Sequence, residues 1–293
     1  MAMPESPTLL LTAQERMPGL LAAFLAPRNP LAERLSEAMH YAVMNGGKRV
    51  RPALVFGAVQ AVGGNVLRAE SAAIAVELVH CYSLVHDDLP CMDDDNLRRG
   101  VPTCHKVFGE ATALLAGDTL QALAFIALGE GRVSAEGTAD QLRALAMAAA
   151  DMAVGQALDL AGEGQSLDVA ALEQIHRHKT GALIRASVAL GAIAGGGGEA
   201  VRKALDTFAD RLGLAFQVHD DVLDVIGDTN RIGKTAGADA ALRKSTYPAL
   251  LGLAEAQALA VHLHDEAVAA LASLGPAANP LRELAHFLVS RDH

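Results

Sequence analysis

The stretch AIAVELVHCYSLVHDDLPCMDDDNLRRG, residues 73–100, decides which fold this chain can adopt. Its first half is a nearly unbroken apolar run. Its second half holds five aspartates within nine residues, followed at once by Arg98 and Arg99. Because core-type side chains reach up to Asp87, the first carboxylates are expected at the mouth of a buried region, where unpaired charge is costly. The stretch therefore predicts a buried helix that ends at a cation site, and a solvated acidic loop is the alternative.

The composition of the whole chain favours a helical protein. Of its 293 residues 51% are hydrophobic and 3% aromatic, and Ala and Leu outnumber the residues that favour strands. A formal net charge of −10 argues against a nucleic-acid partner, which would require a basic face. Three cysteines without CxxC spacing fit a reducing cytoplasm. Charged residues interrupt every apolar stretch of membrane-spanning length, so we expect a cytoplasmic protein without a membrane span.

Helical periodicity is nearly continuous after residue 29. The expected helices are 30–45, 51–62, 68–89, 109–130, 137–161, 168–177, 180–194, 200–226, 242–272 and 278–290. None of the Gly- and Pro-rich breaks between them has the length of an interdomain linker. We therefore expect one all-α domain over residues 1–293, a bundle of about ten core helices around a central apolar cavity. Residues 1–29 are expected to be loose or to form a short leading helix.

A second acidic cluster lies on the expected helix 200–226. Four residues turn a helix by about 400°, so Asp220 and Asp224 share a face, and Gln217 lies one turn before Asp221. The flanking residues are apolar, which disfavours a merely solvated face. Mg²⁺ prefers oxygen ligands and is typically held by one or two carboxylates together with substrate phosphates. Two acidic clusters that face each other across a bundle would suit a bridging diphosphate.

Basic residues near helix ends and glycine-rich turns bracket both clusters. Each could be an ordinary helix-end charge, but together they indicate a site for phosphorylated ligands; they are Lys48, Arg49, Arg51, Arg98, Arg99, Lys179, Lys234 and Lys244. The segment 227–235 looks like a phosphate-binding P-loop, but its glycine spacing is wrong and it follows a helix instead of a strand. A P-loop is therefore rejected.

Two motifs resemble those of a known family. The pattern DDxxxxD from Asp87 to Asp93 and the pattern DDxxD from Asp220 to Asp224 resemble the two aspartate-rich motifs of the trans-isoprenyl diphosphate synthases. The likeness runs from about residue 46 to residue 251 and includes GGKRVRP, HKTGALI and KSTYPALLGL in family order. It is greatest to the bacterial short-chain farnesyl diphosphate synthases. The resemblance implies the helical bundle of the isoprenoid synthases and a homodimer.

The resemblance also implies a role for each matching residue. Three residues would coordinate Mg²⁺, with three ions expected per active site: Asp87, Asp93 and Asp220. Three more would complete or support those metal sites: Asp88, Asp221 and Asp224. The diphosphate of isopentenyl diphosphate would be held by Lys48, Arg51, His80 and Arg99. The allylic diphosphate would be held by Arg98, Lys179, Thr180, Gln217, Lys234 and Lys244. Catalysis would rest on Asp87, Asp88, Asp93, Arg98, Lys179, Asp220 and Lys234.

The length of the product is expected to depend on the helix that leads into the first motif. Ser83 lies one turn before Asp87, and Tyr82 lies five residues before it, roughly 7.5 Å along the axis at 1.5 Å per residue. A growing tail would meet both side chains. An aromatic residue at the Tyr82 position accompanies fifteen-carbon products in the family. We therefore expect a farnesyl diphosphate synthase acting on dimethylallyl and then geranyl diphosphate.

Three other functions remain to be separated from this one. A geranylgeranyl diphosphate synthase would use the same site with a deeper cavity. A class I terpene cyclase would carry a different second metal motif. A non-catalytic prenyltransferase subunit would lack an aspartate motif or the basic ligands, and this chain has both.

Overall fold

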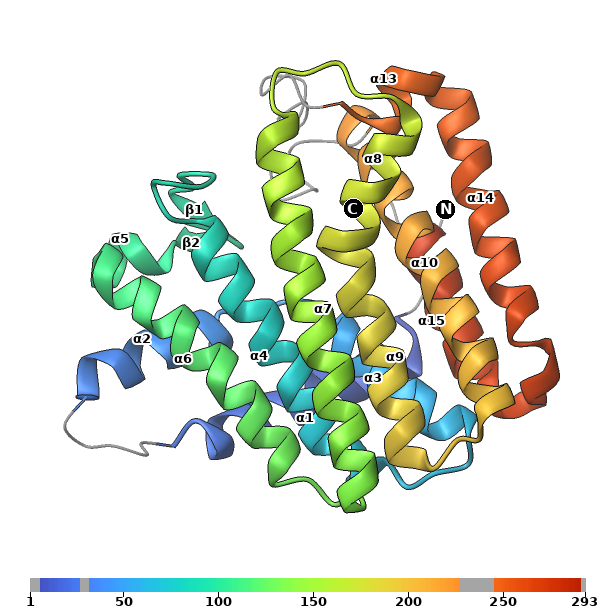
Figure 1. Cartoon of the computed structure of the whole chain (residues 1–293), viewed down its shortest axis with the longest axis horizontal. Helices are drawn as coiled ribbons and strands as arrows, with labels where there is room; N and C mark the ends of the chain where they lie inside the picture. Colours follow the sequence, from blue (N-terminus) through green and yellow to red (C-terminus); the bar gives the residue numbers. More distant parts are fainter. Residues whose placement is uncertain (1–5, 27–31, 227–244, 291–293) are drawn as a thin grey trace.

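The structure is a computed structural model that describes residues 6–26, 32–226 and 245–290. Helices make up nearly all of these residues (Figure 1). The strands found within these ranges are Leu97–Arg98 (β1) and Val101–Pro102 (β2), which pair antiparallel as a small hairpin. The prediction of an all-α fold is confirmed.

The helices follow one another along the chain in the order α1 (Thr8–Phe24), α2 (Glu33–Met44), α3 (Val50–Ala61), η2 (Val66–Ala69), α4 (Glu70–Asp87), α5 (Cys104–Phe108), α6 (Glu110–Gly129), α7 (Ala135–Gly162), α8 (Val169–His176), η3 (Arg177–Gly181), α9 (Ala182–Gly195), α10 (Glu199–Ile226), α13 (Tyr247–Leu251), α14 (Leu253–Ala270), η4 (Ala272–Ala278) and α15 (Asn279–Ser290). Most expected helices are present with ends within a few residues of the prediction. The leading segment forms α1, and α5 was not expected.

The prediction of one continuous helix over 242–272 is wrong for residues 245–272, where the structure has two helices, α13 and α14. Thr246 caps the start of α13 by accepting a hydrogen bond from the backbone N–H of Ala249 at 3.4 Å. α13 stops at Gly252, whose φ of 87° lies in the left-handed region that favours glycine. α14 then starts in a new direction. Residues 242–244 lie outside the described residues.

The core is built around helices that are apolar on nearly every side. α3, α4 and α9 contact one another, and α6 and α7 cover them (Figure 1). α3 and α9 approach closely at Gly191, where a Cβ atom would lie 2.3 Å from the carbonyl oxygen of Val55. Helices surrounded in this way need apolar residues all round. This explains why the run before Asp87 carries so few polar side chains.

Two helices in the described ranges, α6 and α7, are long and apolar enough to cross a membrane by length and composition alone. Within the most apolar window of each, 44% of α6 and 33% of α7 is buried inside the molecule. α6 packs along α4, and α7 packs along α9. Packing in the bundle therefore accounts for part of their apolar character, and exposed apolar side chains account for the rest.

Candidate active site

The two acidic motifs lie at the same end of the bundle. α4 ends at Asp87, and α10 carries Asp220 and Asp224 in its last two turns. In Figure 1 both helices run to the upper end of the molecule, where β1, β2 and α8 also lie. The positive charge of Lys179, in η3, acts on the Asp87 carboxylate. The end of α4 and the turn η3, which leads into α9, therefore lie close together at this end of the bundle.

The chain folds back on itself directly after α4. The backbone N–H of Asp93 donates to the carbonyl oxygen of Asp87 at 2.8 Å, and Asp94 adopts a left-handed conformation with φ of 50°. This turn brings Asp93 beside Asp87. Burial raises the pKa of the Asp87 carboxyl to about 6, and the charge of Asp93 adds to the rise while Lys179 opposes it. Carboxylates that resist ionisation in this way gain most from a bound cation.

Asp88, the next residue along the chain, is buried and engaged with Arg98. It is 3% exposed, and the Nε of Arg98 donates to its Oδ1 at 2.6 Å. The Nη2 of Arg98 also donates to Asp95 at 3.0 Å, a contact that the sequence did not predict. Burial raises the pKa of Asp88 and Arg98 opposes this. Asp88 therefore orients Arg98, which fits a supporting role better than direct metal coordination.

The three carboxylates of the second motif lie on two different faces of α10. Asp220 and Asp224 are half-buried on one face of α10, whereas Asp221 is 6% exposed. Asp221 accepts a hydrogen bond from the backbone N–H of Tyr247 at 3.0 Å, and the Nε2 of His176 lies 3.8 Å from the same oxygen. Burial lowers the pKa of His176 to about 4, so its ring is neutral at physiological pH. Asp221 thus ties α10 to the start of α13, and the neutral His176 ring of α8 lies close by.

Lys179 and Thr180 lie in η3, a π-helical turn of the kind often found at functional sites. The Nζ of Lys179 donates to Asp159 of α7 at 2.6 Å. A Cβ atom at Gly155 would lie 2.2 Å from the backbone nitrogen of Lys179, so glycine is needed for this approach. Asp159 holds the ammonium group near Asp87. The sequence offered no signal for this pairing beyond an acidic residue in an apolar helix.

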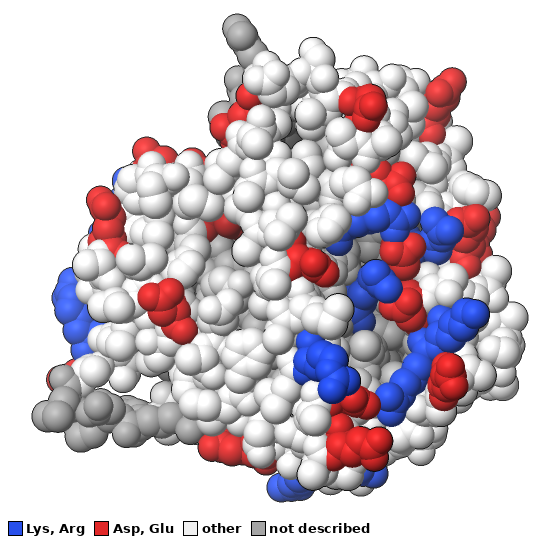
Figure 2. Space-filling model, in the orientation of Figure 1, with Lys and Arg blue, Asp and Glu red and all other residues white. Residues whose placement is uncertain are grey.

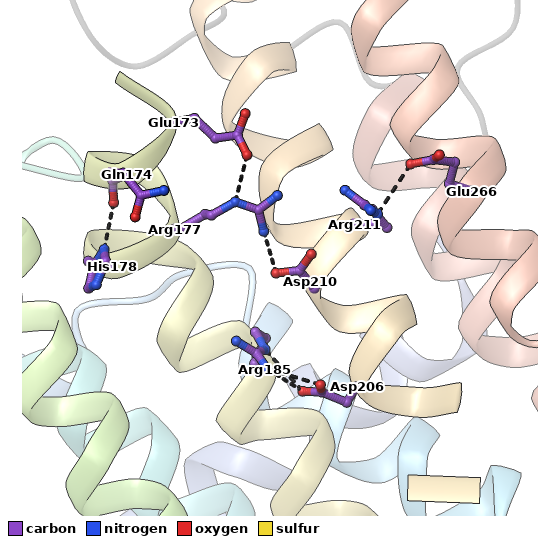
Figure 3. Close-up of polar contacts among 9 residues, drawn as sticks. All are labelled: Glu173, Gln174, Arg177, His178, Arg185, Asp206, Asp210, Arg211 and Glu266. Carbon is purple, nitrogen blue, oxygen red and sulfur yellow. Dashed lines mark hydrogen bonds and ion pairs between the residues drawn. The ribbon is translucent and has the colours of Figure 1, made fainter. Parts of the chain in front are cut away.

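Ion pairs fix this turn to α10, as Figure 3 shows. Arg177, the first residue of η3, donates from Nε to Glu173 at 2.7 Å and from Nη1 to Asp210 of α10. Two further pairs tie α9 to α10 and α10 to α14: Arg185 with Asp206 and Arg211 with Glu266. The helix that carries the second motif and the turn that carries Lys179 are therefore linked side by side.

A basic cluster lies at the loop before α3 and at α4. Arg99 donates to the Oδ1 of Asn45 at 3.0 Å and stacks over Gly47, where a Cβ atom would lie 2.6 Å from its guanidinium carbon. Burial lowers the pKa of His80 far below its usual value, and the charges of Arg51 and Arg99 lower it further. These side chains therefore gather around His80. Lys48 and Arg99 are exposed to solvent.

Tyr82, the first of the two residues expected to limit the product, lies against α6, where its side chain hydrogen-bonds Gln121. Tyr82 is 8% exposed, and its ring meets the edge of His86 with 5.8 Å between centroids. The Nε2 of His86 lies 3.0 Å from the carbonyl oxygen of Leu114 in α6. Ser83 donates to the carbonyl oxygen of His80 at 2.9 Å. Tyr82 is therefore packed on α4 between one and two turns before Asp87.

Thr180 and Gln217 are half-buried in η3 and α10. Lys234 and Lys244 lie outside the described residues. The Arg49 side chain turns inward and is only 4% exposed.

The acidic residues fit a metal that is shared with a ligand. Among the described residues, no group of three or more His, Cys, Asp or Glu side chains is arranged to hold a metal ion by itself. Asp87 and Asp93 form an incomplete set of metal ligands, because they offer carboxylate oxygens but are only two, and they lie beside basic side chains. Hard divalent ions that keep water and phosphate ligands suit such an incomplete set.

In this bundle two acidic helix ends and a basic cluster lie at the same end of the molecule. This combination defines the class of the prenyltransferases that make isoprenyl diphosphates. The chain belongs to the polyprenyl synthetase family, whose model matches residues 32–271. It is 48% identical to the farnesyl diphosphate synthase of Escherichia coli K12, with 93% of this chain and 94% of that protein covered. Membership of this family implies a requirement for a divalent metal ion.

Two relatives with a different product are also similar. A chloroplastic geranylgeranyl pyrophosphate synthase, number 12 of Arabidopsis thaliana, is 46% identical, with 90% of this chain and 76% of that protein covered. The crystal structure of a geranylgeranyl pyrophosphate synthetase from Pyrococcus horikoshii superimposes with a TM-score of 0.88 at 33% identity, covering 97% and 98% of the two chains. The predicted family and fold are confirmed.

Proposed function

We propose that this chain is a cytoplasmic farnesyl diphosphate synthase, which joins isopentenyl diphosphate first to dimethylallyl diphosphate and then to geranyl diphosphate. The observation that carries the proposal is the meeting of Asp87, Asp93 and Lys179, from α4 and η3, at the end of the bundle to which α10 also runs. The identity to farnesyl diphosphate synthases supports the same reaction. The cytoplasmic location fits its three cysteines, all of which are free thiols.

The acidic residues would hold Mg²⁺ on the allylic diphosphate. Asp87, Asp93 and Asp220 are the proposed ligands, and Asp224 shares the half-buried face of Asp220. Asp88 and Asp221 would act through the contacts that orient Arg98 and α13. When bound, three Mg²⁺ ions would neutralise charge on the diphosphate. The metal identity and number belong to this proposal.

The basic side chains would complete the site for the leaving group. The allylic carbon–oxygen bond breaks and its electron pair leaves with the diphosphate, where Arg98 and Lys179 offset the growing negative charge. Lys179 is already close to Asp87, so exchange from Asp159 to a diphosphate oxygen requires a short movement. Thr180, Gln217, Lys234 and Lys244 are the further proposed ligands.

The carbon–carbon bond forms in the apolar part of the site. The double bond of isopentenyl diphosphate, held by Lys48, Arg51, His80 and Arg99, supplies the electron pair for the new bond. A proton then leaves the neighbouring carbon, with the released diphosphate as its acceptor. A sleeve of Ala, Leu and Val offers no nucleophile to trap the allylic cation.

Product length separates this proposal from a geranylgeranyl diphosphate synthase. Some relatives of similar identity bear that second name, so identity alone does not decide. Tyr82 favours the fifteen-carbon product, because its ring is buried against His86 and α6, where small movements are resisted by close packing.

The deciding experiment is product analysis with the purified chain. It is incubated with isopentenyl diphosphate, Mg²⁺ and, in separate reactions, dimethylallyl or geranyl diphosphate, and products are identified by mass. A C15 product from both primers is expected. Mainly C20 product would favour geranylgeranyl synthesis, and no turnover by a folded protein that binds Mg²⁺ and substrate would favour a non-catalytic subunit.

The proposal includes a homodimer formed by the α6 and α7 face. Figure 2 shows that charged side chains gather over α9, α10 and α14, whereas the face over α6 and α7 is largely uncharged. Large apolar side chains are exposed on these two helices: Leu114, Leu115, Ile126, Met147, Val154 and Leu158. An exposed apolar set of this kind marks a protein interface.

A further inference from the structure

Helix α4 carries a carboxylate, Glu77, that is buried in the core of the molecule, away from both aspartate motifs. Glu77 lies ten residues before Asp87, about 15 Å along the helix axis, and is 2% exposed. It forms an ion pair with Arg49, whose side chain is 4% exposed and whose Nη2 also donates to the carbonyl oxygen of Val43 at 2.8 Å. A charge at such depth is costly unless it is paired.

Glu77 serves more than one cation. Its charge acts on Arg51, where it opposes the lowering of the pKa caused by burial, and it has the same effect on Arg99. The Nε of Arg51 is buried without a hydrogen-bond partner. Glu77 thus pairs directly with Arg49 and acts through its charge on Arg51 and Arg99, so three positive charges stand against one negative charge. This excess is available to an anion.

The ion pair also determines the path of the loop that leads into α3. Arg49 has φ of 55°, a left-handed conformation that is uncommon for a residue with a side chain. Its hydrogen bonds to Glu77 and to the end of α2 hold it there. Lys48 before it then points to solvent, and Arg51 after it lies against His80. Anchoring Arg49 therefore fixes the backbone from which Lys48 and Arg51 extend.

We propose that Glu77 is a positioning residue for the diphosphate of isopentenyl diphosphate, acting through Arg49. This rests on the proposed function, because the cluster of Lys48, Arg51, His80 and Arg99 is assigned to that substrate there. Charge alone, without the positioning of Arg49, predicts the opposite effect on diphosphate binding. A carboxylate beside the site should repel the diphosphate, so its removal should tighten binding.

The test is Glu77→Gln, which keeps the size of the side chain and removes its charge. The KM for isopentenyl diphosphate is expected to rise about tenfold, with the KM for geranyl diphosphate unchanged. Glu77→Asp should recover part of the loss. Glu70→Gln is the matched control, because Glu70 pairs with Arg16 at the other end of α4 and should leave both KM values unchanged.

Binding of inorganic pyrophosphate to the free protein separates this inference from the proposed function. Calorimetric titration in EDTA silences any site that needs metal, so the remaining binding reports the basic cluster. Wild type should bind and Glu77→Gln should bind about tenfold more weakly. This result stands whether or not the chain makes a prenyl product.

If Glu77→Gln fails to fold, the double variant Arg49→Met with Glu77→Leu removes both buried charges and should restore folding, because apolar replacements of buried ion pairs are tolerated. It should retain the weak pyrophosphate binding. Unchanged or tighter binding in either variant, or a loss of kcat with both KM values intact, would overturn the inference.

Discussion

Replacing Asp87 by Asn should stabilise the metal-free protein while removing its activity. Burial and the neighbouring Asp93 raise the pKa of the Asp87 carboxyl from 3.8 to about 6. The folded protein therefore binds this proton more tightly than the unfolded chain does. As pH rises from about 4 to above 6, the folded state loses stability, because the charged carboxylate is favoured in the unfolded chain.

The size of the effect follows from the shift. Two units of pKa correspond to about 3 kcal/mol at pH 7.5 and roughly half of that at pH 5. Asp87→Asn removes the ionisation, so its free energy of unfolding should exceed that of wild type by these amounts. For a chain of this size the midpoint of thermal unfolding should rise by on the order of 5 °C at pH 7.5.

The assay is urea unfolding of both proteins in EDTA at several pH values between 5 and 7.5. Asp151→Asn, an exposed change on α7, is the control and should follow wild type. Added Mg²⁺ and pyrophosphate should stabilise wild type more than Asp87→Asn, which keeps the basic cluster but lacks the metal ligand, and the variant should lose several orders of magnitude in turnover. Equal stability of Asp87→Asn and wild type at pH 7.5 without metal would refute the reasoning.

Three further changes test other parts of the structure. Gly155→Ala should displace the backbone at Lys179, lower the free energy of unfolding by more than about 1 kcal/mol and reduce activity. Gly129→Ala, where the space around the Cβ is open, should be neutral or slightly stabilising. Denaturation curves and rate measurements compare the two variants. Tyr82→Ala should shift the product from C15 towards C20 by mass analysis, and an unchanged product would show that Tyr82 sets no limit. Leu115→Asp should convert a dimer to a monomer in analytical ultracentrifugation, and an unaltered mass would exclude this face.

The positions of most helices could be predicted from the sequence because their causes are local. Apolar periodicity and the Gly-rich breaks after Gly195 and around Gly63 depend on neighbouring residues alone. The break at Gly252 was missed, since a single glycine in an apolar run is equally compatible with a continuous helix. The left-handed backbone there follows from the packing of α13 and α14 on α10.

The sequence by itself determined that carboxylates end α4 and line the last turns of α10, since the residues and their helical spacing are enough for that. Which carboxylate faces outward was decided by the tertiary structure: Asp221 is buried because α13 docks beside it, while Asp220 remains half-exposed. The pairs Lys179 with Asp159 and Arg49 with Glu77 join residues 20 and 28 positions apart. Their partners come together through the burial of apolar helix faces, a cooperative effect that no local spacing encodes.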